Sequence, residues 1–242
     1  MTATAGGALA GRTAVVTGAG RGIGRAIAES LAAAGAHVAI CARTASEVDE
    51  SAAAVCAAAA KARAPGAVLA LVCDVSSEAA VAAFADAVRA RFGAAYVVVN
   101  NAGTVARGRL DEQDPAEWLS VVDVNLTGTY RVTRAFLAAM RRARAGRIIN
   151  IASISGRQGT PRLTAYCAAK HAVVGLTRAL AEEVRDDHVQ VNAICPGSVD
   201  TRMLEGSGFA PAMSAADVAR VALFLAAEAP DALTGSCLDV FG

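Results

Sequence analysis

The stretch RTAVVTGAGRGIG at residues 12–24 decides the fold expected for this chain of 242 residues. Residues 12–17 are mostly apolar or β-branched and predict a buried strand. The glycine-rich segment 18–24 follows, and the alanine-rich segment 25–34 predicts a helix. A strand, a glycine turn and a helix in this order begin a βαβ unit, in which the helix N-terminus offers free N–H groups to a phosphate.

Short apolar strands alternate with long helices along the rest of the chain. Further strands are expected at 37–41, 67–73, 96–100, 147–152, 189–194 and 237–241, and further helices at 46–64, 77–92, 117–142, 165–185 and 215–227. This alternation predicts one α/β domain over residues 11–242, preceded by a flexible leader over 1–10. We expect a doubly wound, parallel, seven-stranded sheet with helices on both faces, and ligands at the carboxyl ends of its strands.

Composition argues against several classes of function. The formal net charge is +1 and the basic residues are scattered, so neither nucleic acid nor a strongly acidic partner is expected. No run approaches the ~20 apolar residues of a membrane helix, and residues 1–10 lack the features of a signal peptide, so we expect a cytoplasmic protein without membrane attachment. The six cysteines form no CxxC pair, which argues against a disulfide framework and against a metal site.

Residues 17–24 read TGAGRGIG, a TGxxxGxG spacing at the end of the first predicted strand. Glycines there let backbone N–H groups approach a pyrophosphate, although a plain tight turn also needs glycine. The position in a βαβ unit favours a dinucleotide site. The expected contacts from this loop come from Gly18, Arg21, Gly22, Ile23 and Gly24.

The residues at the end of the second predicted strand, Cys41-Ala42-Arg43-Thr44, indicate which dinucleotide is bound. An NAD enzyme would place Asp or Glu there to accept hydrogen bonds from the ribose hydroxyls. The carboxylate is missing here, and Arg43, flanked by Thr44 and approached by Arg21, can instead hold a 2′-phosphate. The sequence therefore predicts NADP(H); two solvated surface arginines are the alternative interpretation.

Asp74 and Val75 end the third predicted strand and are further candidate cofactor contacts. The Asp74 carboxylate could hold the adenine amino group. An acid at a helix N-terminus, ahead of Ser76 and Ser77, explains the same residue equally well. Both interpretations stay open.

Tyr166 and Lys170 lie one helical turn apart in the predicted helix 165–185, so they share one face. A tyrosine has a reference pKa of ~10, and a nearby ammonium favours its ionised form. We expect Lys170 to lower the pKa of Tyr166 toward ~7 and to hold the ribose hydroxyls of a nicotinamide.

Ser153 and Asn125 complete a candidate catalytic set. Ser153 follows the strand 147–152, where its hydroxyl could donate to a carbonyl oxygen that gains charge. Asn125 is a mediocre helix former inside 117–142, and we expect it to kink the helix and hold a water that relays protons. Each of the four side chains has a structural explanation when taken singly. Their joint occurrence beside a nucleotide loop favours hydride transfer between a nicotinamide and a carbonyl or alcohol carbon.

With these motifs the sequence resembles the short-chain dehydrogenase/reductase family over residues 11–242. The matching motifs are the glycine loop 17–24, Asn100-Asn101-Ala102-Gly103, Asn125, Ser153, Tyr166 with Lys170, and Pro196-Gly197 followed by Val199 and Thr201. The resemblance implies a Rossmann-type fold and a homotetramer built through the helices at 117–142 and 165–185. It also implies contacts to the adenosine ribose from Asn101, Ala102 and Gly103, and to the nicotinamide from Pro196, Gly197, Val199 and Thr201.

Within the family, segments 149–156, 165–177 and 233–240 look most like 3-oxoacyl-acyl-carrier-protein reductases and polyketide ketoreductases. This resemblance implies NADPH-dependent reduction of a ketone, in a 3-oxoacyl thioester or a similar β-keto compound, with tyrosine as the acid. The expected substrate lid, about 202–213, is short, and no residue identifies the substrate. The alternatives are an NAD(P)-dependent dehydrogenase of a secondary alcohol or sugar, and a noncatalytic dinucleotide-binding regulator.

Overall fold

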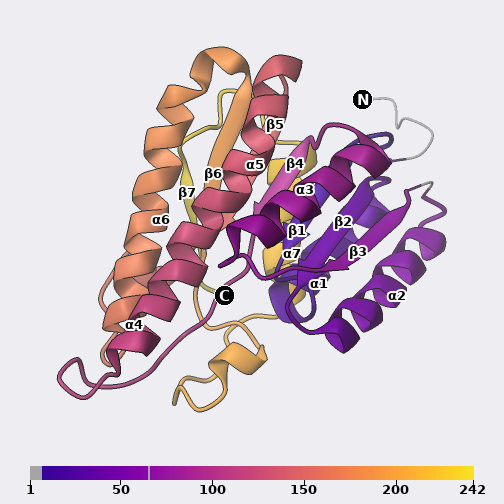
Figure 1. Cartoon of the computed structure of the whole chain (residues 1–242). Helices are drawn as coiled ribbons and strands as arrows, with labels where there is room; N and C mark the ends of the chain where they lie inside the picture. Colours follow the sequence, from indigo (N-terminus) through magenta and orange to yellow (C-terminus); the bar gives the residue numbers. More distant parts are fainter. Residues whose placement is uncertain (1–6, 65) are drawn as a thin grey trace.

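The computed structural model describes residues 7–64 and 66–242 and confirms the expected doubly wound α/β fold (Figure 1). The strands are β1 (Thr13–Thr17), β2 (His37–Ala42), β3 (Val68–Val72), β4 (Val97–Asn100), β5 (Gly146–Ile151), β6 (Val189–Pro196) and β7 (Cys237–Val240). The helices are α1 (Gly22–Ala33), α2 (Ala45–Lys61), α3 (Glu78–Phe92), α4 (Pro115–Val122), α5 (Gly128–Ala143), α6 (Thr164–Glu183) and α7 (Ala215–Ala227). All strand pairs are parallel, in the order β3-β2-β1-β4-β5-β6-β7.

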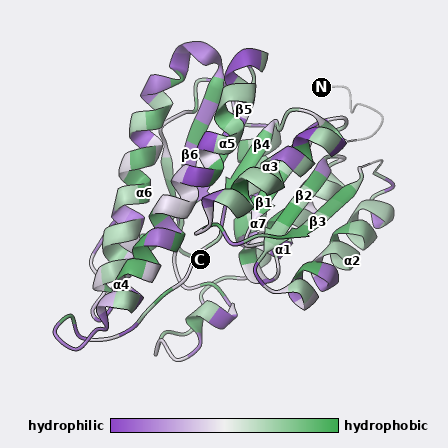
Figure 2. Ribbon diagram, in the orientation of Figure 1, coloured by the Kyte–Doolittle hydropathy of each residue, from purple (hydrophilic) through white to green (hydrophobic). Residues whose placement is uncertain are grey.

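Helices cover both faces of this sheet. Helix α1 contacts α2 and α7 on one face, and α3 contacts α5 on the other, where α6 packs on β6. Consecutive residues of a strand pack into hydrophobic cores on opposite faces of the sheet. Val16 packs in the core on the α1 side, and Val15 packs in the core on the α3 side. Figure 2 accordingly shows mostly hydrophobic residues in β1, β2, β3 and β4. Strands buried on both faces tend to be near-continuous apolar runs rather than alternating ones, and such runs can be recognised in the sequence as strands.

The domain begins before the expected boundary at Gly11. Leu9 is 1% exposed and belongs to the core on the α1 side, and its N–H donates to the Ala34 carbonyl at the end of α1 over 2.9 Å. The expected leader at 1–10 is therefore wrong at its C-terminal end, because an isolated leucine between small residues carries no periodic signal. The leader's residues 1–6 lie outside the described residues.

The helix expected over 117–142 is in fact interrupted by a π-helical turn. Helix α4 ends at Val122, the turn Asp123–Thr127 follows, and α5 begins at Gly128. Asn125 lies in the middle of this turn, and its amide donates to the Val121 carbonyl over 2.8 Å. Single π-turns inside helices occur frequently at functional sites. The expected distortion at Asn125 is confirmed.

No helix in the described part of the chain combines the length and the apolarity needed to cross a membrane.

Two buried amides tie the centre of the sheet to α5 and α6. Asn100 of β4 donates to the Thr133 hydroxyl of α5 over 2.9 Å and to the Asn150 side-chain oxygen of β5 over 2.8 Å. Asn150 in turn donates to the Thr177 hydroxyl of α6 over 2.9 Å. All four side chains are buried. The network thus fixes two helices against the sheet through buried polar groups.

We expect Asn150→Ala to lower the free energy of unfolding by about 2–4 kcal/mol, because it leaves a buried donor of Asn100 without its acceptor and opens a small cavity. Urea denaturation measures the difference. As a control, Arg134→Gln removes an exposed ion pair with Glu78 and should change stability by less than about 0.5 kcal/mol. A fully stable Asn150→Ala variant would contradict the structural role of the network.

Candidate active site

The glycine loop between β1 and α1 lies too close to the segment after β4 for a side chain at Gly18 or Gly24. A Cβ on Gly18, whose φ is +62°, would lie 2.6 Å from the Ala102 Cα, and one on Gly24 would lie 2.4 Å from the Asn101 Nδ2. The Asn101 amide donates to the carbonyls of Thr17 and Gly18, both over 3.0 Å. Two segments far apart in sequence are thereby joined into one wall.

Polar side chains that the sequence analysis did not single out hold this wall in place. The Thr17 hydroxyl accepts the N–H groups of Asn101 and Ala102 over 3.1 and 3.2 Å. Arg25 donates to the Gly20 carbonyl over 2.6 Å and to the Ser51 hydroxyl over 2.7 Å. In the sequence, the threonine at the carboxyl end of β1, immediately before the loop, is the feature that could have indicated this contact.

The N-terminus of α1 is open to an anion. In the described structure its N-cap residue, Arg21, makes no side-chain hydrogen bond to the helix, and the first turn contains no acidic residue. The first N–H groups of a helix have no partner inside the helix and carry partial positive charge. With the glycine loop beside it, this helix end fits a pyrophosphate.

Most predicted dinucleotide contacts line one cavity of about 350 Å³ at the carboxyl ends of the strands. They are Gly18, Arg21, Gly22, Ile23, Arg43, Thr44, Asp74, Val75, Asn101, Ala102, Gly103 and Thr201. A second cavity, of about 860 Å³, is lined by Ser153, Tyr166, Lys170, Pro196, Gly197, Val199 and Thr201. Ile23, Asn101, Gly103 and Thr201 line both. The two halves of the expected site are therefore continuous.

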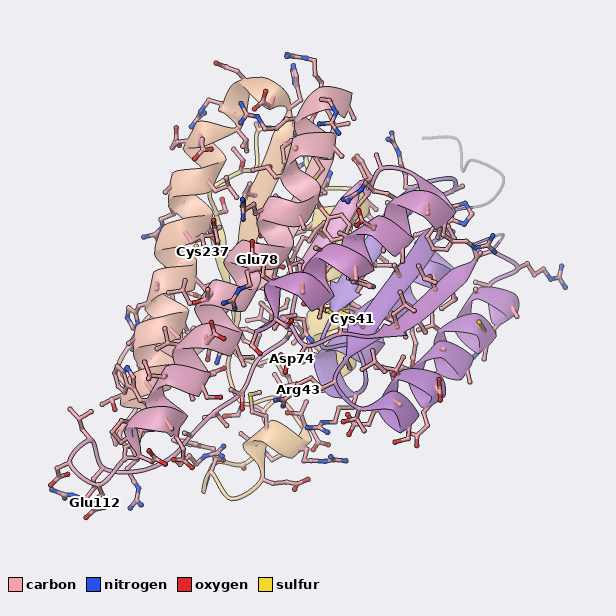
Figure 3. The ribbon with its side chains drawn as sticks, in the orientation of Figure 1. Cys41, Arg43, Asp74, Glu78, Glu112 and Cys237 are labelled. Carbon is pink, nitrogen blue, oxygen red and sulfur yellow. The ribbon has the colours of Figure 1, made fainter. Side chains whose placement is uncertain are left out.

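A carboxylate that the sequence analysis missed lines the first cavity beside the arginines. Glu47, in the first turn of α2, forms a short ion pair with Arg21 and a second ion pair with Arg202 over 3.3 Å. Arg43 has no ion pair among the described residues, and its charge acts on Asp74, beside which Figure 3 shows it. The end of β2 therefore lacks a carboxylate, whereas the cavity beside it contains the carboxylate of Glu47.

Asp74 faces the cavity and also shapes the turn before α3. One of its carboxylate oxygens accepts the Ser76 N–H over 2.9 Å and the Ser76 hydroxyl over 2.7 Å. Burial acts to raise the pKa of Asp74, but these hydrogen bonds and the charges of Arg43 and Arg131 lower it overall. The N-cap of α3 is Ser77, which accepts the Ala80 N–H. Asp74 is therefore an ionised turn residue rather than the helix cap.

The candidate catalytic side chains Ser153, Tyr166 and Lys170 meet in the second cavity. Ser153 follows β5, accepts the Ser155 N–H over 3.1 Å and is hydrogen-bonded to Tyr166. Lys170, one turn after Tyr166 on α6, donates from its Nζ to the Ile151 carbonyl over 2.8 Å. This Nζ lies 5.6 Å from the centre of the Tyr166 ring. Lys170 is buried, with 4% of its surface exposed.

Burial controls the ionisation of both groups. It raises the pKa of Tyr166 to about 12, against the hydrogen bond with Ser153 and the charge of Arg107, which both lower it. Burial also lowers the pKa of Lys170 to about 8. The expected lowering of the Tyr166 pKa by Lys170 is therefore wrong for this structure. The loss of water around the phenol raises its pKa more than the nearby charges lower it. The Lys170 ammonium is also held by the Ile151 backbone carbonyl. Tyr166 keeps its proton at neutral pH.

Asn125 lines neither cavity in the described structure. Its amide also donates to the Thr104 carbonyl over 2.7 Å, and its backbone carbonyl accepts the Thr129 hydroxyl over 2.8 Å. A Cβ on Gly103 would lie 2.8 Å from the Asn125 Oδ1. That Oδ1 is buried and has no hydrogen-bond partner among the described residues. The expected water relay stays a prediction.

The segment expected to form the lid begins after β6 and is closed at its base. Val199 forms a parallel bridge with Met213, and the N–H of Gly197 donates to the Val240 carbonyl over 2.8 Å. The segment holds a short 3-10 helix at Arg202–Leu204, and Met203 and Leu204 line the second cavity.

Comparison with known proteins identifies the family. The family model for short chain dehydrogenase matches residues 12–209. The chain is 39% identical to the 3-oxoacyl-acyl-carrier-protein reductase FabG of Pseudomonas aeruginosa, with 97% of each chain covered. It is 44% identical to a protein named as a ketoacyl reductase of the granaticin polyketide synthase of Streptomyces violaceoruber, over 82% of this chain and 72% of that one. The crystal structure of levodione reductase superposes with a TM-score of 0.89 at 31% identity, over 96% of both chains.

The chain therefore belongs to the short-chain dehydrogenase/reductase family. It is an oxidoreductase of carbonyl or alcohol groups that binds a nicotinamide dinucleotide, and the expected resemblance to 3-oxoacyl-acyl-carrier-protein reductases and polyketide ketoreductases is confirmed.

The buried ammonium predicts a pH-dependent cost to stability. Because the folded state holds the pKa of Lys170 at about 8, below its ordinary value of 10.5, the unfolded chain binds more protons between these values. Wild-type stability should therefore rise relative to Lys170→Met, by about 2 kcal/mol between pH 7 and pH 10. Urea denaturation of both proteins across this range measures the difference. A constant difference would contradict the depressed pKa.

Proposed function

We propose that this chain is an NADPH-dependent reductase of ketones, acting on 3-oxoacyl thioesters or similar β-keto compounds. The observation that carries the proposal is the convergence of a protonated Tyr166, the Ser153 hydroxyl and the buried Lys170 ammonium in one cavity. This cavity is continuous with the one lined by Arg43 and Arg21. The names of the FabG and ketoacyl reductase relatives support the substrate class.

The bound dinucleotide would supply the hydride from its nicotinamide. In the proposed reaction, Ser153 donates a hydrogen bond to the substrate carbonyl oxygen, which gains negative charge as the hydride arrives. Tyr166 then transfers its phenolic proton to that oxygen. A phenol whose pKa is about 12 is left as an unfavourable phenolate, so the positive charge of Lys170 is needed to stabilise it.

The cofactor contacts proposed from sequence fit the structure's chemistry. The α1 N-terminus and Ile23 would hold the pyrophosphate, and Asn101, Ala102 and Gly103 would line the ribose. Arg43, with Thr44, would bind the 2′-phosphate, and Arg21 would join it by exchanging its ion pair with Glu47 for the phosphate. Pro196, Gly197, Val199 and Thr201 would flank the nicotinamide.

We also propose that Asn125 holds a water for proton relay, that the protein is cytoplasmic, and that it assembles as a homotetramer. The assembly is supported by two exposed hydrophobic side chains on the expected interface helices: Leu119 on α4 is 65% exposed and Tyr130 on α5 is 49% exposed. Burying these exposed apolar surfaces against a neighbouring subunit would favour association.

Glu47 is the specific observation that favours a second function, an NAD-dependent dehydrogenase of a secondary alcohol or sugar. Its carboxylate lines the first cavity, where it could accept hydrogen bonds from ribose hydroxyls. Fluorescence titration with NADPH and NADH, followed by assays on a carbonyl panel that includes an acetoacetyl thioester, separates the two functions. A clear preference for NADPH with thioester turnover supports the reductase, and a preference for NADH overturns the role given to Arg43 and Arg21. Binding without turnover of any substrate would favour the noncatalytic regulator.

Tyr166→Phe tests the proposed acid. The variant should bind NADPH with unchanged affinity while kcat falls by a factor of about 10²–10⁴, the usual loss when a general acid is removed. Stopped-flow reduction assays and fluorescence titration give the two readouts. Full activity in this variant would refute the role of Tyr166.

Arg43→Ala tests the 2′-phosphate contact. It should lower kcat/KM for NADPH by about 10- to 100-fold, because a charge-assisted hydrogen bond contributes about 1.5–3 kcal/mol, and leave NADH nearly unaffected. The control is Lys61→Ala, an exposed cation at the far end of α2. An equal loss with both cofactors would argue against recognition of the phosphate by Arg43.

A further inference from the structure

The charged lining of the second cavity is entirely cationic in the part of the chain that the structure describes. Arg107, Arg162 and Lys170 line it, and no aspartate or glutamate does. Lys170 is engaged by the Ile151 carbonyl, whereas Arg107 and Arg162 are exposed and form no ion pair with any described residue. A large cavity of about 860 Å³ thus carries two uncompensated guanidinium groups in its wall.

Another arginine on the same loop does have acidic partners. Arg109, two residues after Arg107, forms ion pairs with Asp111 over 3.3 Å and Glu112 over 3.6 Å. Glu112, labelled in Figure 3, belongs to the outer end of this loop, away from the labelled cofactor-cavity residues Arg43 and Asp74. The acids of the loop therefore neutralise the arginine outside the cavity and leave Arg107 without one.

The backbone brings the two cavity arginines together at some cost. The N–H of Gly108, next to Arg107, donates to the Arg162 carbonyl over 3.1 Å. Arg162 has a φ of +64°, in the left-handed region that residues other than glycine, asparagine and aspartate seldom adopt. Backbone strain of this kind clusters at ligand-binding sites, where the surrounding structure enforces it. Of the four described non-glycine residues with a positive φ, Arg63, Arg144, Arg162 and His188, only Arg162 lines either cavity.

Arg107 also lies within reach of both the chemistry and the lid. Its guanidinium donates to the Met203 carbonyl over 2.6 Å. Its positive charge is felt at the Tyr166 hydroxyl, where it lowers the pKa. An anion bound by Arg107 would therefore lie in the same compartment as the carbonyl that Tyr166 protonates.

We infer that Arg107 and Arg162 form an anion-binding subsite of the substrate cavity, which selects ketones that carry a carboxylate or a phosphate. The inference rests on the proposed function, since the anion belongs to the ketone that is reduced. A guanidinium binds either group through two parallel hydrogen bonds. The anion has two sources, a carboxylate on the ketone itself or the phosphate of a pantetheine arm.

The test compares pairs of substrates in which one member carries an anionic group that the other lacks. One pair is 5-oxohexanoate and its methyl ester; the other is acetoacetyl-4′-phosphopantetheine and acetoacetyl-pantetheine. The variant is Arg107→Gln/Arg162→Asn, in which asparagine tolerates the left-handed backbone and keeps the turn. The ratio of kcat/KM within each pair is the readout, so an effect of Arg107 on Tyr166 cancels.

We expect the wild type to prefer the charged member of at least one pair by about tenfold or more, as is usual for charge-assisted hydrogen bonds, and the double variant to bring that ratio near one. Arg109→Gln, on the same loop, is the matched control and should keep the wild-type ratio. A preference in the first pair identifies a carboxylate on the ketone, and one in the second identifies the phosphate.

Wild-type ratios near one in both pairs, or a double variant that keeps the wild-type ratio, would overturn the inference. If no compound is reduced with either cofactor, the proposed function fails, and the subsite is then tested by isothermal titration calorimetry with the same four compounds. The same tenfold preference in Kd and its loss in the double variant would support the subsite, and equal Kd values would reject it.

Discussion

The ammonium group of Lys170 is buried between α6 and the end of β5, where the Ile151 carbonyl accepts its hydrogen bond. Burying a charge is costly unless hydrogen bonds offset the lost hydration, so this arrangement requires that α6 and β5 keep a fixed distance. The buried amide of Asn150, on the same strand, donates to Thr177 of the same helix and maintains that distance. Much of the central architecture can therefore be understood as support for one cation beside Tyr166.

The fold was predictable because both faces of the sheet are covered, so most strands are largely apolar runs bounded by turns and helices. Much of the lining of the two cavities was predictable, since the carboxyl ends of parallel strands bring Gly18, Arg43, Asp74, Asn101 and Ser153 to one edge. These predictions used only local patterns and the rule that parallel strands end at one edge.

Other features depend on contacts that no local pattern encodes. Leu9 joins the core through a single side chain, and Glu47 reaches the cavity because the first turn of α2 faces the glycine loop. The ionisation of Tyr166 cannot be predicted from residue spacing, which reveals a nearby ammonium but not the loss of water around the phenol. The helix break at Asn125 was foreseen, whereas its π-helical form depends on an amide that bonds to Val121 and Thr104.

The bridge between Val199 and Met213 has a consequence for substrate binding. It closes residues 200–212 into a loop during folding, and the contact from Arg107 to Met203 restricts that loop further. The entropy of loop closure is thus lost before any substrate arrives, and the remaining conformational freedom is that of a short tethered segment. A ligand that orders this segment loses less binding free energy to conformational entropy than a ligand that must order a long free segment. Because residues 200–212 form a short tethered segment, they can support tight substrate binding even though the cavity is wide.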